Sequence, residues 1–164
     1  MLSSQLVIGS AMLAVTVVLH VGGVVLLISG YRYRRDRSGH RETYTRATLL
    51  LVGMTLGILL LHTVEIWLWA LLYVGLGEFR SLEAALYFST VTFTTLGYGD
   101  LTLDERWRIL SSLEAVNGLL LFGISTALLV AVVRRMLTDL SMLEEENATG
   151  GSTPDGRKRN DGAP

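Results

Sequence analysis

Three long apolar stretches constrain this chain more than any other feature of its sequence. They cover residues 6–29, 47–73 and 107–136. The hydrocarbon core of a bilayer is about 30 Å thick, and a helix needs about 20 apolar residues to cross it. Because lipid offers the backbone no hydrogen-bond partner, such a segment has to be helical. The sequence therefore predicts an all-α membrane protein with three transmembrane helices.

The composition agrees with a membrane protein. Of the 164 residues, 50% are hydrophobic, the mean hydropathy is +0.45 and the formal net charge is -1. The chain has no cysteine, so disulfides and thiolate metal sites are excluded. The balanced charge gives no sign of nucleic-acid binding.

The basic residues predict how the chain is oriented in the cell membrane. Arginines gather in the segment 31–46, and the third apolar stretch ends on Arg134 and Arg135. The remaining basic residues follow that stretch, except for Arg80, Arg106 and Arg108. Basic loops stay on the cytoplasmic side. We therefore expect 31–46 to be a cytoplasmic loop, the C-terminus to be cytoplasmic and the N-terminus to be external. Nothing basic precedes the first stretch, so we expect residues 1–30 to remain as a transmembrane helix rather than a cleaved signal.

The segment 81–94 lies between the second and third stretches and is apolar but too short to span the membrane. Ser81 is a suitable N-cap and Glu83 lies in the first turn, so we expect a short re-entrant helix. Both prolines of the chain lie in the segment 138–164, which has no long apolar run, and we expect this tail to be largely disordered.

The sequence Thr95-Leu96-Gly97-Tyr98-Gly99-Asp100 follows the short helix. Irregular backbone at membrane depth is tolerated only where it faces protein or water. Glycine at positions 97 and 99 allows positive φ angles, which can turn successive carbonyl groups in one direction. Rows of carbonyl oxygens can replace the water shell of a monovalent cation. This segment is the strongest candidate for a functional site.

These residues resemble the filter of the potassium channel family, usually written T-V/I-G-Y-G. The resemblance covers a pore domain at 47–137, with an outer helix at 47–75, a pore helix at 81–94, the filter at 95–100 and an inner helix at 107–137. It implies that K⁺ binds in the filter formed by Thr95, Leu96, Gly97, Tyr98 and Gly99, and we expect no cofactor apart from these bound ions. The ligands would be the carbonyl groups of the first four residues and the Thr95 hydroxyl. It also implies a homotetramer, because each chain supplies a single filter loop.

Two residues depart from the family pattern. Leu96 replaces the usual Val or Ile, which leaves the carbonyl group but changes the packing behind the filter. Val91 stands where some members carry a carboxylate bonded to the aspartate after the filter, so Asp100 needs another partner, and Tyr87 or water is a candidate. The residues expected to support the filter are Thr94, Asp100, Tyr87, Phe88 and Val91.

The inner helix has two glycines that bear on gating. Gly123 resembles the hinge glycine of the family, and Gly118 is a second candidate. Close helix packing is the alternative, since small residues favour it in membranes. Packing is the preferred interpretation for Gly118, while both stay open for Gly123. The first apolar stretch has no arginines at helical spacing, so we expect no intrinsic voltage sensor.

Ionisable residues inside the apolar stretches are further candidates, because burying them in a membrane is costly. His62 and Glu65 share one helix face, and Glu114 lies in the outer half of the third stretch. They form either a bracing hydrogen-bond network or a proton sensor, since histidine titrates near neutral pH. His20 is alone on its stretch, and we expect it to be packed or hydrogen-bonded between helices.

Together these patterns predict a potassium-selective channel that conducts passively and is not an enzyme. Its expected partners are K⁺, further copies of the same chain and membrane lipid. A weakly selective cation channel and a non-conducting accessory subunit are the alternatives.

Overall fold

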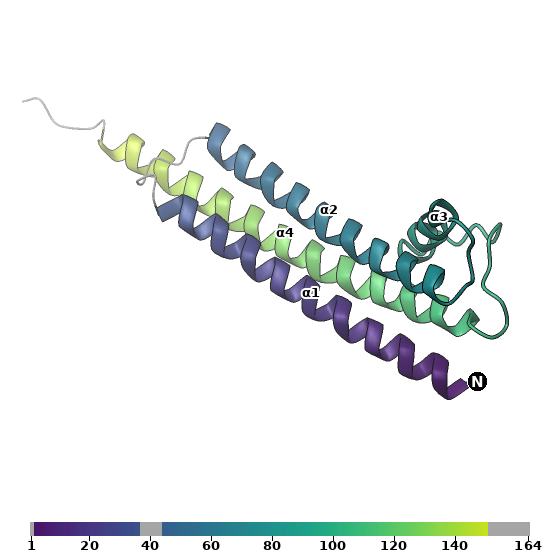
Figure 1. The fold of residues 1–164 in the computed structure, drawn as a ribbon. Coiled ribbons are helices and arrows are strands. Elements are labelled where there is room, and N and C mark those ends of the chain that lie inside the picture. Colours follow the sequence, from purple (N-terminus) through teal and green to yellow (C-terminus); the bar gives the residue numbers. More distant parts are fainter. Residues whose placement is uncertain (1, 37–43, 151–164) are drawn as a thin grey trace, which may run out of the picture.

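The computed structural model describes residues 2–36 and 44–150. These residues form four helices, which are α1 (Leu2–Asp36), α2 (Tyr44–Gly75), α3 (Leu82–Phe93) and α4 (Arg108–Gly150). The three long helices run side by side, and α3 packs against α2 and α4 at one end of the bundle (Figure 1). The N-terminus lies at this same end, whereas the far end of α4 lies at the other (Figure 1). No strand occurs in the described ranges.

Three helical segments are long and apolar enough to cross a membrane, namely Leu2–Tyr33, Ala47–Gly75 and Arg108–Asp139. This confirms the predicted fold class of an all-α protein with three candidate spans. Helix α3 has 12 residues, which at about 1.5 Å per residue is too short to cross the bilayer. The predicted N-cap is present, since the Ser81 side chain accepts a hydrogen bond of 3.2 Å from the Ala84 amide.

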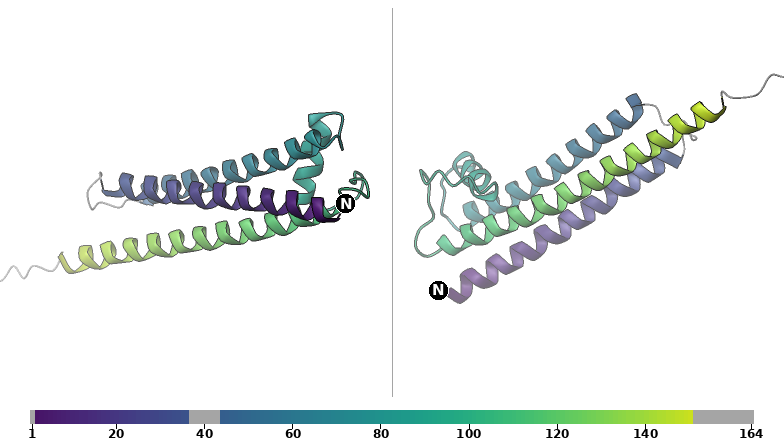
Figure 2. Two further views of the ribbon diagram at one scale, coloured as in Figure 1. Left: turned by 60° about the horizontal axis from the view of Figure 1, so that its bottom comes forward. Right: turned by 180° about the vertical axis from the view of Figure 1, so that it is seen from behind.

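Three predicted helix ends were wrong. Helix α1 continues to Asp36 and α2 begins at Tyr44, so much of the predicted loop at 31–46 is helical. Helix α4 continues to Gly150 and passes the ends of its neighbours (Figure 2), further than the inner-helix end predicted at residue 137. An apolar run stops at the membrane surface, but a helix needs a breaker, and residues 138–149 contain neither glycine nor proline. The rest of the loop and tail predictions falls on 37–43 and 151–164, outside the described residues.

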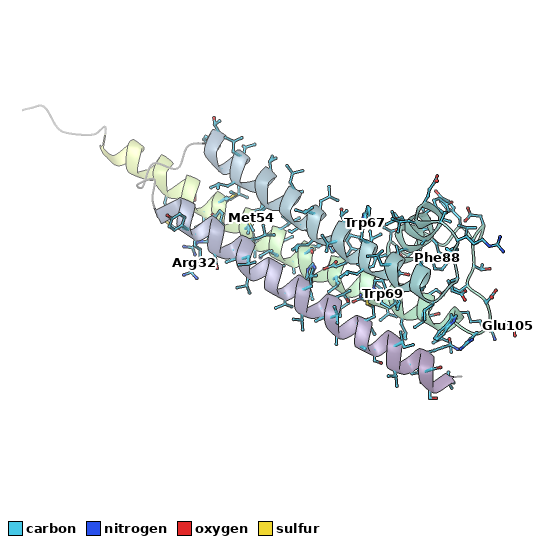
Figure 3. The ribbon with its side chains drawn as sticks, viewed as in Figure 1. Arg32, Met54, Trp67, Trp69, Phe88 and Glu105 are labelled. Atoms are coloured by element: carbon cyan, nitrogen blue, oxygen red, sulfur yellow. The ribbon has the colours of Figure 1, made fainter. Side chains whose placement is uncertain are left out.

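The core is mostly aromatic at the α3 end of the bundle. Its buried members are Trp69, Tyr73, Phe88, Phe93, Leu103, Trp107, Leu110 and Leu121. At the other end α2 and α4 meet through Ala47, Met54, Val132 and Met136. Trp67 and Trp69 point to different sides of α2 (Figure 3), and only Trp67 is exposed. Positions two apart on a helix do not share a face, so only Trp69 joins the core.

Helix α1 is held to the bundle by small residues and by polar bonds. A Cβ atom at Gly9 would lie 2.3 Å from Leu113 Cδ1, and one at Gly23 would lie 2.3 Å from Leu61 Cδ2, so a larger residue at either position would have to displace the leucine side chain that packs against it. The Gln5 side chain accepts a bond of 3.0 Å from the Ile109 amide and thereby caps the start of α4.

Candidate functional site

The C-terminal end of α3 is held against the middle of α4. Phe93 is fully buried, and its ring lies edge-on to Phe122 with the ring centroids 5.7 Å apart. A Cβ atom at Gly118 would lie 2.0 Å from the Phe93 carbonyl oxygen. Glycine at 118 therefore allows α4 to pass directly beside the last turn of α3, which is the packing role preferred for this residue.

The chain turns sharply after α3 because several amides fold back onto its last turn. The Val91 carbonyl accepts hydrogen bonds from the amides of Leu96 and Gly97, at 2.9 and 3.2 Å. The Thr94 hydroxyl donates to the Thr90 carbonyl at 2.7 Å. The Val91 carbonyl thus holds the start of the segment 95–100 against the end of α3.

Positive φ angles alternate along the filter. They are 60° at Thr95, 60° at Gly97 and 78° at Gly99. The two glycines adopt this conformation readily, as predicted, but Thr95 is β-branched and is strained there. Among the described residues, none donates a hydrogen bond to the carbonyl oxygens of Thr95, Leu96, Gly97 or Tyr98. These four carbonyl groups are therefore free to bind a ligand.

Side chains of the filter project away from this single chain. Leu96 is 55% exposed and Tyr98 is 67% exposed. Leu96 thus finds little packing within its own chain, and whatever fills the space behind the filter has to come from outside it.

Asp100 is bonded to Tyr87, one of its two predicted partners. The Tyr87 hydroxyl donates a hydrogen bond of 2.7 Å to its carboxylate. This bond is the main reason why the pKa of Tyr87 is raised above its ordinary value, with desolvation and the negative charge of Asp100 as smaller causes. Phe88, the other member of the aromatic pair, is buried and packs edge-on to Tyr73 with centroids 5.2 Å apart.

A cavity of about 590 Å³ lies between α3, the filter and the first turns of α4. Polar groups on its wall include Thr92, Asp100, Ser111 and Ser112. The filter is therefore backed by open, partly polar space in the single chain.

In a comparison with protein families, residues 48–135 match the family described as ion channel. This chain belongs to that ion channel family. The matched segment contains most of α2, all of α3, the filter and most of α4, whereas α1 lies outside it. The family is not an enzyme class. No curated protein and no solved structure matched the chain.

Glu114 joins three helices of the channel, but its partners are not the predicted residues His62 and Glu65. Its buried carboxylate accepts a hydrogen bond of 2.6 Å from the Tyr73 hydroxyl on α2 and another from the Ser89 hydroxyl on α3. We expected it to share a network with His62 and Glu65. The expectation was wrong because Glu114 lies about three turns further toward the outer end of α4 than Ser125, the α4 residue that contacts His62.

His62 and Glu65 do bond to each other, and His20 joins them. Glu65 accepts from His62 Nδ1 at 2.9 Å and from His20 Nδ1 at 2.8 Å. Ser125 on α4 contacts the Nε2 atoms of His62 and His20 at 3.1 and 3.2 Å. All four side chains are buried. Sequence reasoning missed Ser125, because serine is common in membrane helices and carries no signal by itself.

The donor atoms of His20, His62 and Glu65 lie within 4.8 Å of one another, and this donor set is one that zinc accepts. However, both Nδ1 atoms already bond to the carboxylate. The remaining polar group, Ser125, contacts the opposite ring nitrogens and cannot complete a tetrahedral set. We assign no metal to this cluster.

Gly123 differs from Gly118 in its surroundings. A Cβ atom at position 123 would meet nothing within 4 Å, apart from its own helix. Packing within the chain therefore does not explain this glycine, and the hinge interpretation stays a prediction.

Proposed function

We propose that this chain is a subunit of a potassium-selective channel that conducts K⁺ passively down its electrochemical gradient. The observation that carries the proposal is the alternation of positive φ at Thr95, Gly97 and Gly99, which leaves four successive carbonyl oxygens without a hydrogen bond from the described residues. Carbonyl oxygens in such a row replace the water shell of a dehydrated cation. K⁺ is the only cofactor that we propose, with the Thr95 hydroxyl as a further ligand.

The working unit in this proposal is a homotetramer. One chain contributes one filter loop, and a ring of carbonyl groups around an ion needs several. The exposure of Leu96 and Tyr98 supports this assembly, because a neighbouring subunit would cover both side chains. Four α3 helices would then direct the negative ends of their dipoles toward a central cavity and favour a cation there.

In the membrane, the filter and the N-terminus would lie outside and the C-terminus in the cytoplasm. The arrangement of the helices supports this topology, because α3 and the N-terminus share one end of the bundle (Figure 1). Arg32, at the end of α1, lies far from Glu105 beside the filter (Figure 3). Helix α1 has no charged residue before Arg32, which supports a channel without an intrinsic voltage sensor.

Ion flux into liposomes that contain the purified protein tests the function. We expect K⁺ flux that barium blocks and little Na⁺ flux. Equal fluxes of K⁺ and Na⁺ would favour a weakly selective cation channel, in which packing around Leu96 distorts the ion sites. Absence of flux from folded and assembled protein would favour a non-conducting accessory subunit.

A further inference from the structure

A closed ring of hydrogen bonds joins α1, α2 and α4 inside the membrane. Glu65 lies on one side of two stacked imidazoles, whose centroids are 5.2 Å apart with an interplanar angle of 29°. Each carboxylate oxygen faces the Nδ1 atom of one histidine. On the other side, the single hydroxyl of Ser125 faces both Nε2 atoms. The ring thus runs from Glu65 through His20, Ser125 and His62 back to Glu65.

The number of hydrogens decides whether this ring closes. Each of its contacts needs one hydrogen between donor and acceptor. If Glu65 is ionised and both imidazoles are neutral, each imidazole and the hydroxyl supply one hydrogen, which leaves one contact of Ser125 without any. At that contact, a lone pair of the Ser125 oxygen faces the lone pair of one histidine Nε2 atom. The ring is therefore one proton short in the form that these groups adopt in alkaline solution.

One added proton completes every contact. It resides either on an imidazole beside ionised Glu65, or on the carboxyl group beside two neutral imidazoles. Both forms have zero net charge and use every donor and acceptor of the ring. A second proton would leave two hydrogens facing each other and a net positive charge, while loss of the first leaves a net negative charge. Net charge is strongly disfavoured in a buried, apolar environment.

We propose that His20, His62 and Glu65 form a buried site for one exchangeable proton, which fastens α1 and α2 to α4 through Ser125. The binding step adds H⁺ to the anionic cluster and yields the neutral one, with no other bond made or broken. The contact with Ser125 is complete when the proton is bound and is weakened as the pH rises and the proton leaves.

The position of Ser125 links proton binding to the candidate hinge of α4. It lies two residues beyond Gly123, the candidate hinge of α4, so a proton bound at the ring restrains the helix next to the point at which we expect it to bend. This step, unlike proton binding itself, rests on the proposed channel function.

Other titratable or charged groups lie away from the ring on every packed element. On α4 the nearest such groups among the described residues are Arg134, about 14 Å from Ser125 along the axis at 1.5 Å per residue, and Glu114, about 16 Å away in the other direction. Glu114 bonds to Tyr73 of α2 and to Ser89 of α3. Helix α3 presents Phe93 to His62, with centroids 6.0 Å apart, while its titratable residues, Glu83 and Tyr87, lie nearer its start. Among the described residues, no charged side chain outside the ring is therefore in contact with it.

Two substitutions imitate the ring with its proton bound and the ring after the proton has left. Glu65→Gln places an amide where the carboxyl group was; its oxygen accepts from one Nδ1 and its NH₂ donates to the other, so the ring closes without an exchangeable carboxyl proton. Ser125→Ala removes the contact with α4 and leaves the bonds between Glu65 and the histidines. Thr126→Ala is a matched control, because the Thr126 hydroxyl is exposed and donates to the Phe122 carbonyl of its own helix.

The test uses spin labels on single cysteines introduced at Leu26 of α1 and Val130 of α4, both exposed in this chain, which has no native cysteine. Their separation is measured by electron paramagnetic resonance in lipid nanodiscs from about pH 5 to about pH 11, a range that extends beyond that of free histidine because burial favours the neutral form of the ring. We expect the distance distribution of the wild type and of Thr126→Ala to shift with pH. Glu65→Gln should keep the acid distribution, and Ser125→Ala the alkaline one, at every pH.

A wild-type distribution that does not change with pH would overturn the proposal. A Glu65→Gln variant that follows pH as the wild type does would also overturn it, because the titrating group would then lie elsewhere. The distance measurement needs no ion conduction. A failure of the potassium-channel proposal would show in the liposome flux and would leave this result interpretable.

Discussion

Tyr87 donates a hydrogen bond to Asp100 across 2.7 Å and so ties α3 to the outer end of the filter. Both residues are exposed in the single chain, but the bond spans a segment whose backbone is strained at Thr95. A strained loop persists only where its surroundings hold it. If the segment 95–100 is the filter that we propose, this bond is one of the contacts that hold its carbonyl groups in place.

Substituting Tyr87→Phe removes this bond while keeping the aromatic ring. We expect the channel to assemble and to conduct at first, and then to lose current faster than the wild type as the filter rearranges. Macroscopic currents in planar bilayers measure this decay. Asp100→Asn keeps an acceptor for Tyr87 and should decay more slowly than Tyr87→Phe; equal decay in the wild type and Tyr87→Phe would show that the bond is dispensable.

The same bond makes the stability of the folded protein depend on pH, and the sign of this dependence follows from the raised pKa of Tyr87. A group whose pKa is raised on folding contributes stability below its unfolded value and loses it as the pH rises through the folded value. The unfolded value for tyrosine is about 10. We therefore expect the stabilising effect of Tyr87 to be complete at neutral pH and to be lost only above about pH 10. The unfolding temperatures of the wild type and of Tyr87→Phe should therefore differ at neutral pH and become equal above about pH 10.

Gly118→Ala and Gly123→Ala should have different effects on α4. A methyl group at 118 would meet the backbone carbonyl of Phe93, which cannot move without shifting the end of α3. We expect Gly118→Ala to lower the free energy of unfolding by about 1–3 kcal/mol, as overpacking does, and to impair conduction.

Gly123→Ala, in open space, should unfold like the wild type and show a lower open probability with unchanged ion selectivity. Thermal unfolding in detergent and single-channel recording separate the two variants. An unchanged open probability in Gly123→Ala would exclude the hinge, and wild-type stability of Gly118→Ala would exclude the close contact with Phe93.

Gly97→Ala tests the role of the filter backbone. The φ angle of 60° at this position is left-handed, and a side chain there costs about 1–2 kcal/mol. We expect loss of K⁺ flux from a protein that still folds as a helical bundle, as judged by circular dichroism. Gly75→Ala is the matched control, because its Cβ would also meet open space but its φ is ordinary. Normal flux in Gly97→Ala would contradict the filter assignment.

Tyr73→Phe removes one donor from the buried carboxylate of Glu114. An acceptor left unsatisfied in the core costs about 1–3 kcal/mol. We expect a lower unfolding temperature than that of the wild type. The exposed tyrosine variant Tyr87→Phe provides the comparison and should be affected less. Equal unfolding temperatures for Tyr73→Phe and the wild type would show that the carboxylate finds another donor.

Sequence patterns were sufficient for the parts of the channel that local chemistry controls. The lengths of the apolar stretches predicted three spans, Ser81 marked the start of α3, and glycine at 97 and 99 predicted positive φ. Helix ends were predicted less well, because hydrophobicity reports the membrane boundary and not the end of the hydrogen-bonded helix. The positive φ of Thr95 was not predictable, since it depends on the amides that return to Val91.

By itself, the sequence determined that the chain enters a membrane as helices and that a glycine-containing loop interrupts them, because both depend on neighbours along the chain. Tertiary structure alone decided which buried polar groups meet. Glu114 is hydrogen-bonded to Tyr73 and Ser89, while His20 of α1 contacts Glu65 of α2 and Ser125 of α4. The reason is physical: a buried polar group must be paired, but its partner is set by the rotation and depth of the neighbouring helix, which spacing along one helix does not specify.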